Sequence, residues 1–189
     1  MVFDHDKKMH LEKKDKSSKG SLDEPIMALC ESINSLEDYY TTSSCSGRIV
    51  LLKIPFSGKK NETGWLFVSH DTVDKHQVSK AFTSLPEEEV WFRFEPLILH
   101  VAARNLDSAH KLLDLAQKLG IKRSGIIALG NKIVIEIIGS ERIDTIVGRG
   151  GNLLVSQEYL TVLVDSANDK MHKNWENIKK LEAGIKNIE

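Results

Sequence analysis

The chain has 189 residues, of which 41 % are hydrophobic and 28 % are charged, and its formal net charge is −1. These values are typical of a globular domain with a sizeable core, and they exclude a disordered chain. The longest apolar runs, such as PLILHVAA at 96–103, are far shorter than the roughly 20 residues of a membrane span. Because the chain opens with the charged MVFDHDKKMH, no secretion signal is recognised and a cytoplasmic location is expected.

The sequence predicts a basic N-terminal segment, residues 1–20, followed by a single α+β domain over 21–189. Residues 7–20 carry six lysines and two acidic residues, so this part of the segment is basic. We expect the segment to form a helix or a loose arm. The first helix of the domain, within 21–36, is expected to begin with a capping box. In it the side chains of Ser21 and Glu24 each accept a hydrogen bond from the backbone N–H of the other residue. Its buried face is predicted from apolar residues at helical spacing: Ile26, Cys30, Ile33 and Leu36.

Strand patterns fill the middle of the chain. RIVLLKI (48–54) and GWLFVSH (64–70) predict two neighbouring strands, and DTVDKHQVSKAF (71–82) predicts a short helix capped by Asp71. VWFRFEPLILHVAAR (90–104) is strand-like on both sides of Pro96, which must interrupt the ladder of hydrogen bonds.

The last third of the chain contains the clearest helix, 105–120, which Asn105 caps and Gly120 ends. A hairpin is expected over 125–138 with its turn at Gly130 and Asn131. Residues 141–156 form a glycine-rich connection, and a helix of about 25 to 30 residues begins near Ser156. This order of elements predicts an α+β fold with a mixed sheet packed by helices.

The two cysteines, Cys30 and Cys45, are expected to stay reduced in a reducing compartment. The seven histidines show no HxxxH spacing, and no CxxC is present, so no metal site is expected. No strand is followed by GxGxxG and a helix, which excludes a Rossmann-type dinucleotide or adenosyl site.

The run TTSSCSGR at 41–48 gathers small polar side chains and leaves three interpretations open. It fits a strand edge whose hydroxyls bond to backbone. It fits a polar ligand cradle, in which Gly47 permits close approach and Arg48 offers a planar fork to a carboxylate or phosphate. A nucleophilic Cys45 beside Arg48 fits less well, because a phosphatase loop needs about five residues between them and two are present.

Two histidines are candidate bases. His100 alternates with apolar residues in a strand, so it is either a satisfied core histidine or a base at the sheet surface. His70 ends a strand, where side chains often reach a cleft. Glu95 is expected to share a face with Arg93 and to pair with it.

Several motifs taken together closely resemble the wybutosine-synthesis methyltransferase family, in its compact archaeal-type form. They are TTSSCSGRI, WLFVSH, FRFEPLILHVAARNL, AHKLLDLAQKLGIKRSGI and IEIIGSERIDTIVGRGGNLLVSQEYLTVLVDSANDKM, in this order over about residues 20–175. The resemblance implies a fold without the Rossmann core. It also implies transfer of a methyl group from S-adenosylmethionine to N4 of the tricyclic 7-aminocarboxypropyl-demethylwyosine base, at position 37 in the anticodon loop of tRNA(Phe).

Mapped onto this chain, the family's motifs imply a set of site residues. Those expected to bind substrate or cofactor are Ser43, Ser44, Cys45, Ser46, Gly47, Arg48, Ser124 and Gly125. The catalytic candidates are His100 or His70 as the base, with Glu95 as its orienter or as an alternative base. Positive charge for RNA is expected from Lys122, Arg123, Lys170 and Lys173, although such charges also occur on ordinary solvated faces. Two other classes of function stay open: a non-catalytic RNA- or nucleotide-binding module, and a hydrolase that uses Cys45.

Overall fold

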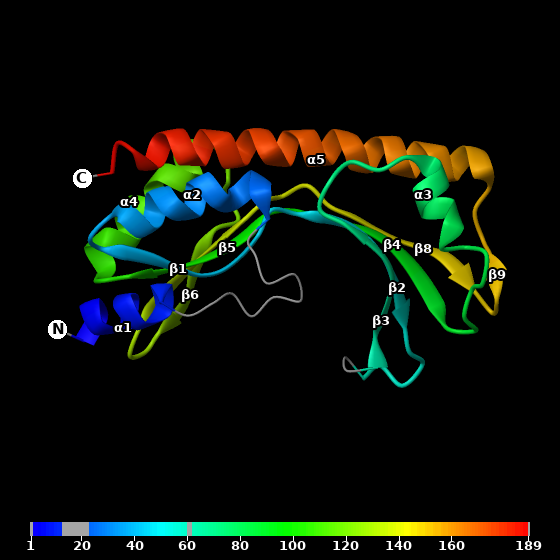
Figure 1. Cartoon of the computed structure of the whole chain (residues 1–189), viewed down its shortest axis with the longest axis horizontal. Helices are drawn as coiled ribbons and strands as arrows, with labels where there is room; N and C mark the ends of the chain where they lie inside the picture. The colour runs from blue at the N-terminus through cyan, green and yellow to red at the C-terminus, as the bar shows by residue number, and fades with distance from the viewer. Residues whose placement is uncertain (1, 13–22, 60–61, 189) are drawn as a thin grey trace. The chain divides into compact units, whose positions relative to one another are not determined.

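The structure, a computed structural model, describes residues 2–12, 23–59 and 62–188. These residues group into two compact units, of which the first takes in Met1–Ser46, Leu97–Ser140 and Asn174–Glu189 and the second Gly47–Pro96 and Glu141–Lys173. Figure 1 labels the elements, which are taken here one unit at a time. The predicted Ser21 cap and residues 13–20 of the basic segment lie outside the described residues.

The first unit contains α1 (Val2–Leu11), α2 (Glu24–Ser35), β1 (Tyr39–Cys45), β5 (Ile98–Ala103), α4 (Leu106–Lys118), β6 (Gly125–Leu129) and β7 (Ile133–Ile138). The second contains β2 (Arg48–Ile54), β3 (Gly64–Ser69), α3 (Lys75–Lys80), β4 (Glu89–Glu95), β8 (Ile143–Arg149) and β9 (Asn152–Leu153). The last helix, α5 (Gln157–Ile185), belongs to the second unit up to Lys173 and to the first from Asn174 onward.

Each unit has its own antiparallel sheet, with the strand order β1-β5-β7-β6 in the first and β3-β2-β4-β8-β9 in the second. The α+β class is confirmed, but the described strands form two antiparallel sheets where one mixed sheet was expected. Pro96 explains part of the difference. A proline cannot donate to a ladder, and here it separates β4 from β5, which belong to different sheets.

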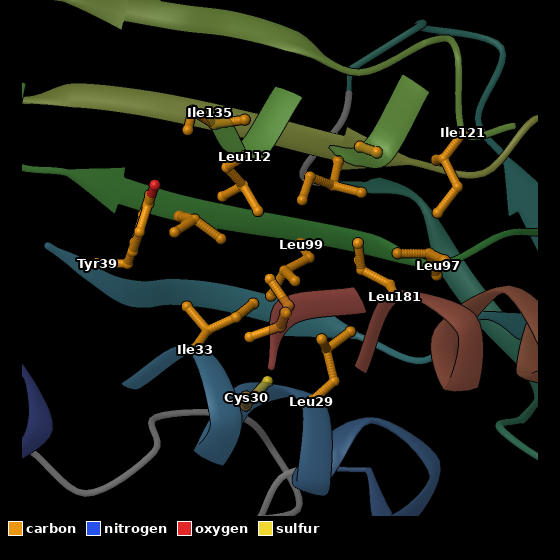
Figure 2. Packing of buried hydrophobic residues seen from close by; sticks show 14 of the residues in the cluster. Leu29, Cys30, Ile33, Tyr39, Leu97, Leu99, Leu112, Ile121, Ile135 and Leu181 are labelled. Atoms are coloured by element: carbon orange, nitrogen blue, oxygen red, sulfur yellow. The ribbon is translucent and has the colours of Figure 1, made fainter. Parts of the chain in front are cut away.

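The core of the first unit lies between its sheet and three helical segments (Figure 2). Alternate residues of β5 and β7 point into it, including Leu99 and Ile135, which are fully buried. α2, α4 and the end of α5 supply the facing side chains, among them Leu29, Leu112 and Leu181. Each such side chain contributes about 2 kcal/mol through its removal from water. Cys30 lies in this cluster, as its helical position predicted, and burial raises the pKa of its thiol to about 11.

The opposite face of this sheet is covered at one end by α1. The rings of Phe3 and His10 lie 5.3 and 5.5 Å from that of Tyr40. Ion pairs hold the helix to the rest of the unit: Asp4 to Arg104 at 2.7 Å and Asp6 to Lys132 at 3.0 Å. The first residues of the predicted basic segment are therefore helical.

In the second unit, β4 alternates between fully buried residues (Val90, Phe92, Phe94) and partly exposed ones (Trp91, Arg93, Glu95). α3 and the first part of α5 lie on one side of this sheet (Figure 1). Two hydrogen bonds between Asn168 and the backbone of Val73 fasten the segment before α3 to α5.

Most of the predicted helix ends and turns are confirmed. Asn105 caps α4 by accepting from Ser108 N at 2.8 Å, and Gly120 has a φ of 89° just after that helix. The β6–β7 hairpin and the helix beginning after Ser156 are also present.

Two of the predictions for the second unit were wrong. α3 begins at Lys75, so Asp74 is its N-cap and forms a capping box with Gln77. The carboxylate of Asp71, the predicted cap, accepts instead from Thr72 N. The glycine-rich connection contains strands β8 and β9, which meet at a turn where Gly150 and Gly151 have positive φ values.

Candidate functional site

The polar run begins as strand β1, at the edge of the first unit's sheet. Its partner is β5, and the register shifts between Thr41 and Ser43, which indicates a β-bulge at Thr42. The hydroxyl of Thr42 donates to the carbonyl oxygen of His100 at 3.3 Å. The expected strand edge is therefore present, but only part of that interpretation holds, because the hydroxyl of Thr42 bonds to backbone whereas those of Thr41 and Ser43 bond to side chains. It does not exclude a ligand role, because the bulge places Ser43 directly opposite His100.

Four residues form one row across the sheet: Ser43 on β1, His100 on β5, Glu136 on β7 and Gly125 on β6. Ser43 Oγ lies 2.9 Å from His100 Nδ1, and Glu136 Oε2 lies 2.9 Å from His100 Nε2. The side chains of His100 and Glu136 are 27 % and 28 % exposed, and Ser43 is exposed. The row therefore lies on the face opposite the core, within reach of a ligand.

The contacts of His100 assign its tautomer when the imidazole is neutral. A carboxylate only accepts hydrogen bonds, so Nε2 carries the hydrogen and donates it to Glu136. Nδ1 then holds the lone pair and accepts from the hydroxyl of Ser43. This arrangement can take up a proton at Nδ1 and stabilise the resulting imidazolium with the carboxylate of Glu136.

Glu136 was not among the residues predicted from the sequence. A signal was present, because Glu136 is the single charged residue in the strand IVIEII and alternation places it opposite the buried Ile135 and Ile137. What the sequence lacked was the strand order, which brings β7 next to β5.

The end of the polar run is anchored by a buried network. Asn174 of α5 accepts from Leu97 N at 2.7 Å and donates to the carbonyl oxygen of Ser46. Ser46 in turn donates to Asp23 Oδ2 from its backbone N at 2.9 Å and from its hydroxyl at 3.1 Å. Ser46 and Asn174 are 0 % and 1 % exposed. Ser46 therefore has a structural role in this network, because both of its donors bond to Asp23.

The neighbouring motif residues have different environments. Ser44 is hydrogen-bonded to Cys30 on the core side of the sheet, while Cys45 is half-buried. Gly47 is buried and has a φ of 99°, a conformation that favours glycine. The hydroxyl of Ser124 donates to Ile121 O at 3.0 Å, and Gly125, which no protein atom crowds, extends the row beyond Glu136.

In the second unit, Arg48 and Glu95 form an ion pair with Arg48 Nε 2.6 Å from Glu95 Oε2. The predicted pairing of Glu95 with Arg93 was wrong, because the register places Glu95 opposite Arg48 and Arg93 opposite Asp144. Arg93 Nε lies 2.6 Å from Asp144 Oδ1. His70 directly follows β3 and is half-buried.

The predicted RNA-binding residues fall into two groups. Lys122, Arg123 and Lys173 are exposed. Lys170 is half-buried, and its ammonium lies 2.6 Å from Glu141 Oε2, which lowers the pKa of that carboxyl. The charge of Lys170 is thus already compensated within the second unit.

Across residues 2–12, 23–59 and 62–188, no helix combines the length and the apolar character that a bilayer span requires.

Comparisons with known proteins identify the family of the chain. The family described as Methyltransferase TYW3 matches residues 6–187. A Pyrococcus horikoshii protein named tRNA(Phe) 7-((3-amino-3-carboxypropyl)-4-demethylwyosine(37)-N(4))-methyltransferase 1 is 41 % identical over 168 residues, 88 % of this chain and 86 % of that protein. The mouse tRNA wybutosine-synthesizing protein 3 homolog is 36 % identical over 176 residues, 91 % of this chain and 68 % of the relative. The solved structure of the PH1069 protein from Pyrococcus horikoshii has a TM-score of 0.90 at 39 % identity, covering 97 % of this chain and 95 % of that one. The chain therefore belongs to the TYW3 methyltransferase family.

Proposed function

We propose that this chain methylates N4 of 7-(3-amino-3-carboxypropyl)-4-demethylwyosine at position 37 in the anticodon loop of tRNA(Phe), with S-adenosylmethionine as the donor. Membership of the family supports methyl transfer, and the name of the Pyrococcus horikoshii relative supports the substrate. The observation that carries the mechanism is the imidazole of His100, which is hydrogen-bonded to a hydroxyl on one side and to a carboxylate on the other. A cytoplasmic location stays a prediction.

The surface beside His100 has the chemistry that the donor requires. Half-buried Ile98 and Ile138 pair with each other on the same face, next to the hydroxyl of Ser43 and the carboxylate of Glu136. An adenosyl sulfonium presents an apolar base, hydroxyls and positive charge, and these residues match each of them. When bound, S-adenosylmethionine supplies an electrophilic methyl group.

The chain's own residues would handle the proton of the substrate nitrogen. Ser43 accepts a hydrogen bond from that N–H while its own hydroxyl donates to His100 Nδ1. The proton lost on methylation then moves through the hydroxyl to Nδ1, and Glu136 stabilises the imidazolium. A positioned base of this kind typically accounts for about 10²- to 10⁴-fold in rate.

The other predicted residues keep secondary roles in the proposal. Arg48, oriented by Glu95, contacts polar groups of substrate or cofactor, and His70 is the alternative base. Base 37 is stacked in its loop, so we expect it to be extruded before methyl transfer. Lys122 and Arg123 provide exposed charge for the tRNA phosphates.

The direct test is incubation of the protein with a labelled methyl donor and tRNA(Phe) that carries the unmethylated tricyclic base, followed by location of the label. We expect the label on base 37. His100→Ala should lower the single-turnover rate by about 100-fold or more without weakening tRNA binding. His110→Ala, which removes an exposed histidine of α4, is the matched control.

Two results would contradict the proposal. If S-adenosylmethionine does not raise the melting temperature and no label is transferred, the chain is a non-catalytic RNA- or nucleotide-binding module. If His100→Ala and His110→Ala transfer methyl groups equally fast, His100 takes no part in the chemistry. Loss of a hydrolytic activity in Cys45→Ser would instead support the hydrolase.

A further inference from the structure

One face of the second unit's sheet carries two tryptophan–arginine pairs. The guanidinium carbon of Arg48 lies 4.4 Å from the ring centre of Trp65, and that of Arg93 lies 5.1 Å from the ring centre of Trp91. Leu52 of β2 is the register partner of both tryptophans, Trp65 on β3 and Trp91 on β4. The two indoles therefore flank Leu52 in one row. We call the surface formed by Arg48, Trp65, Trp91 and Arg93 the tryptophan–arginine face.

Among the described residues of the second unit, no helix covers this face. α3 and the first part of α5 lie on one side of the sheet (Figure 1). Phe92 and Phe94, which are fully buried and alternate with Trp91 and Arg93, point away from the tryptophan–arginine face, so we infer that the helices cover the side of the phenylalanines. Trp65 is 49 % exposed, and Val68, which the register shift in β3 places on the same face opposite Val50, is 45 % exposed. A large indole that is half in solvent on an open sheet is available to a partner.

Each of the two guanidinium groups contacts a carboxylate through its Nε atom. Glu95 engages Nε of Arg48, and Asp144 lies against Nε of Arg93, each at 2.6 Å. Across the described residues, the structure records no hydrogen bond from the Nη atoms of either arginine. Two planar groups are thus fixed over aromatic rings while their terminal donors stay available for acceptors on a ligand.

We propose that unpaired nucleotides of the tRNA loop stack on the tryptophan–arginine face, and that the Nη groups of Arg48 and Arg93 donate to acceptors on the base edges. This inference rests on the proposed function, which supplies the tRNA. Stacking of a base on an aromatic side chain is worth about 1 to 3 kcal/mol and tolerates any base. Sheets that present exposed aromatic residues are a recurrent platform for single-stranded RNA.

The chemistry of the face favours RNA over an apolar protein partner. An apolar partner would cover the Nη donors without satisfying them, and a buried unsatisfied donor is costly. Base edges offer oxygen and nitrogen acceptors in the plane of a stacked ring. Because Glu95 and Asp144 compensate the two arginines, this face adds little general attraction for phosphates.

The test is the affinity of a fluorescently labelled anticodon stem–loop for three variants. Trp65→Leu should weaken binding by about 5- to 100-fold, which is the loss of one stacked base. Trp65→Phe, which keeps an aromatic face, should restore most of the affinity. Tyr159→Leu removes an aromatic residue of the same unit with a similar exposed fraction, 46 %, and should bind as the unaltered protein does. The rise in melting temperature with S-adenosylmethionine should be equal in all three, which confirms that they are folded.

The outcomes separate this inference from the proposed function. If the unaltered protein methylates base 37 but Trp65→Leu binds the stem–loop as tightly as Tyr159→Leu does, the stacking surface is wrong and the methyltransferase stands. If the stem–loop binds through Trp65 but no methyl group is transferred, the methyltransferase is wrong and the stacking surface stands. If Trp65→Leu abolishes self-association without changing RNA affinity, the face is a protein interface and the inference is overturned.

Discussion

His100 and Glu136 meet across strands β5 and β7, with His100 Nε2 2.9 Å from Glu136 Oε2. Because the carboxylate fixes which ring nitrogen carries the hydrogen, it leaves the basic nitrogen on the side of Ser43. In the proposed mechanism Glu136 is therefore a positioning residue, which acts on the substrate only through the imidazole.

Glu136→Gln should slow single-turnover methyl transfer by about 10- to 100-fold, the loss expected when a hydrogen bond to a charged group becomes neutral. The amide still accepts from Nε2, but it carries no charge that could stabilise the imidazolium formed in the reaction. The affinity for tRNA should not change. Glu176→Gln, an exposed site on α5, is the control. Equal single-turnover rates in Glu136→Gln and Glu176→Gln would show that the charge of Glu136 takes no part in the chemistry.

The double variant Lys122→Ala/Arg123→Ala should weaken tRNA binding and make it less sensitive to salt. Each phosphate contact releases counterions, so loss of two contacts should reduce the slope of log affinity against log salt by roughly 1 to 2. Fluorescence anisotropy over a series of KCl concentrations measures this slope. Lys186→Ala, whose ammonium already pairs with Glu182, should leave it as it is. Equal slopes in both variants would place the phosphate contacts elsewhere.

Asn174→Ala should lower the free energy of unfolding by about 2 to 3 kcal/mol. The truncation removes the buried partner of Leu97 N and of the Ser46 carbonyl, and an unsatisfied buried group costs about 1 to 3 kcal/mol. Urea denaturation followed by circular dichroism measures the change, with the exposed Lys180→Ala as control. A loss below 0.5 kcal/mol, roughly that of an ordinary surface substitution, would mean that water replaces the amide.

The attachment of α1 should weaken in acid. The hydrogen bond from Arg104 lowers the pKa of the Asp4 carboxyl from 3.8 to about 2. A carboxyl with a depressed pKa stabilises the folded state above its ordinary pKa and loses that contribution as pH falls through the folded value. The protection of the α1 amides, measured as their exchange rate relative to the intrinsic rate at the same pH, should therefore fall between about pH 4 and pH 2.

Asp38 shares Arg104 and also has a lowered pKa, since the hydrogen bonds from Ser108 and Arg104 outweigh the effect of burial, so it adds to the same trend. Asp4→Asn should show fast exchange in α1 already at pH 5. Exchange that stays slow in Asp4→Asn would assign the attachment to the aromatic contacts with Tyr40.

Local signals in the sequence predicted the fold where neighbours along the chain decide it. The cap at Asn105 and the stop at Gly120 depend on contacts within a few residues, and the helical spacing of apolar residues in α2 shows which face is buried. The pairing of strands depends on distant segments. No local pattern shows that β4 and β5, separated by Pro96, join different sheets, or that Arg48 is paired with Glu95.

The site also depends on contacts between segments that are far apart in the sequence. Ser43 and His100 were both identified as candidates, but their contact depends on a bulge at Thr42 that alternation does not reveal. Glu136 became visible only once β7 was placed beside β5. The catalytic and binding roles of all the candidate residues, including His70 as a base and Ser124 in binding, stay predictions.

The irregularity at Thr42 decides which kind of alcohol the imidazole meets. With unbroken pairing from Tyr40 and Thr41, the secondary alcohol of Thr42 would stand opposite His100, and its methyl branch would restrict rotation about the bond that carries the oxygen. The extra residue shifts the strand by one place and presents a primary alcohol instead. The primary alcohol of Ser43 rotates freely about its Cα–Cβ bond. In the proposed mechanism its oxygen can therefore accept a proton from the substrate while its hydroxyl hydrogen passes to His100 Nδ1.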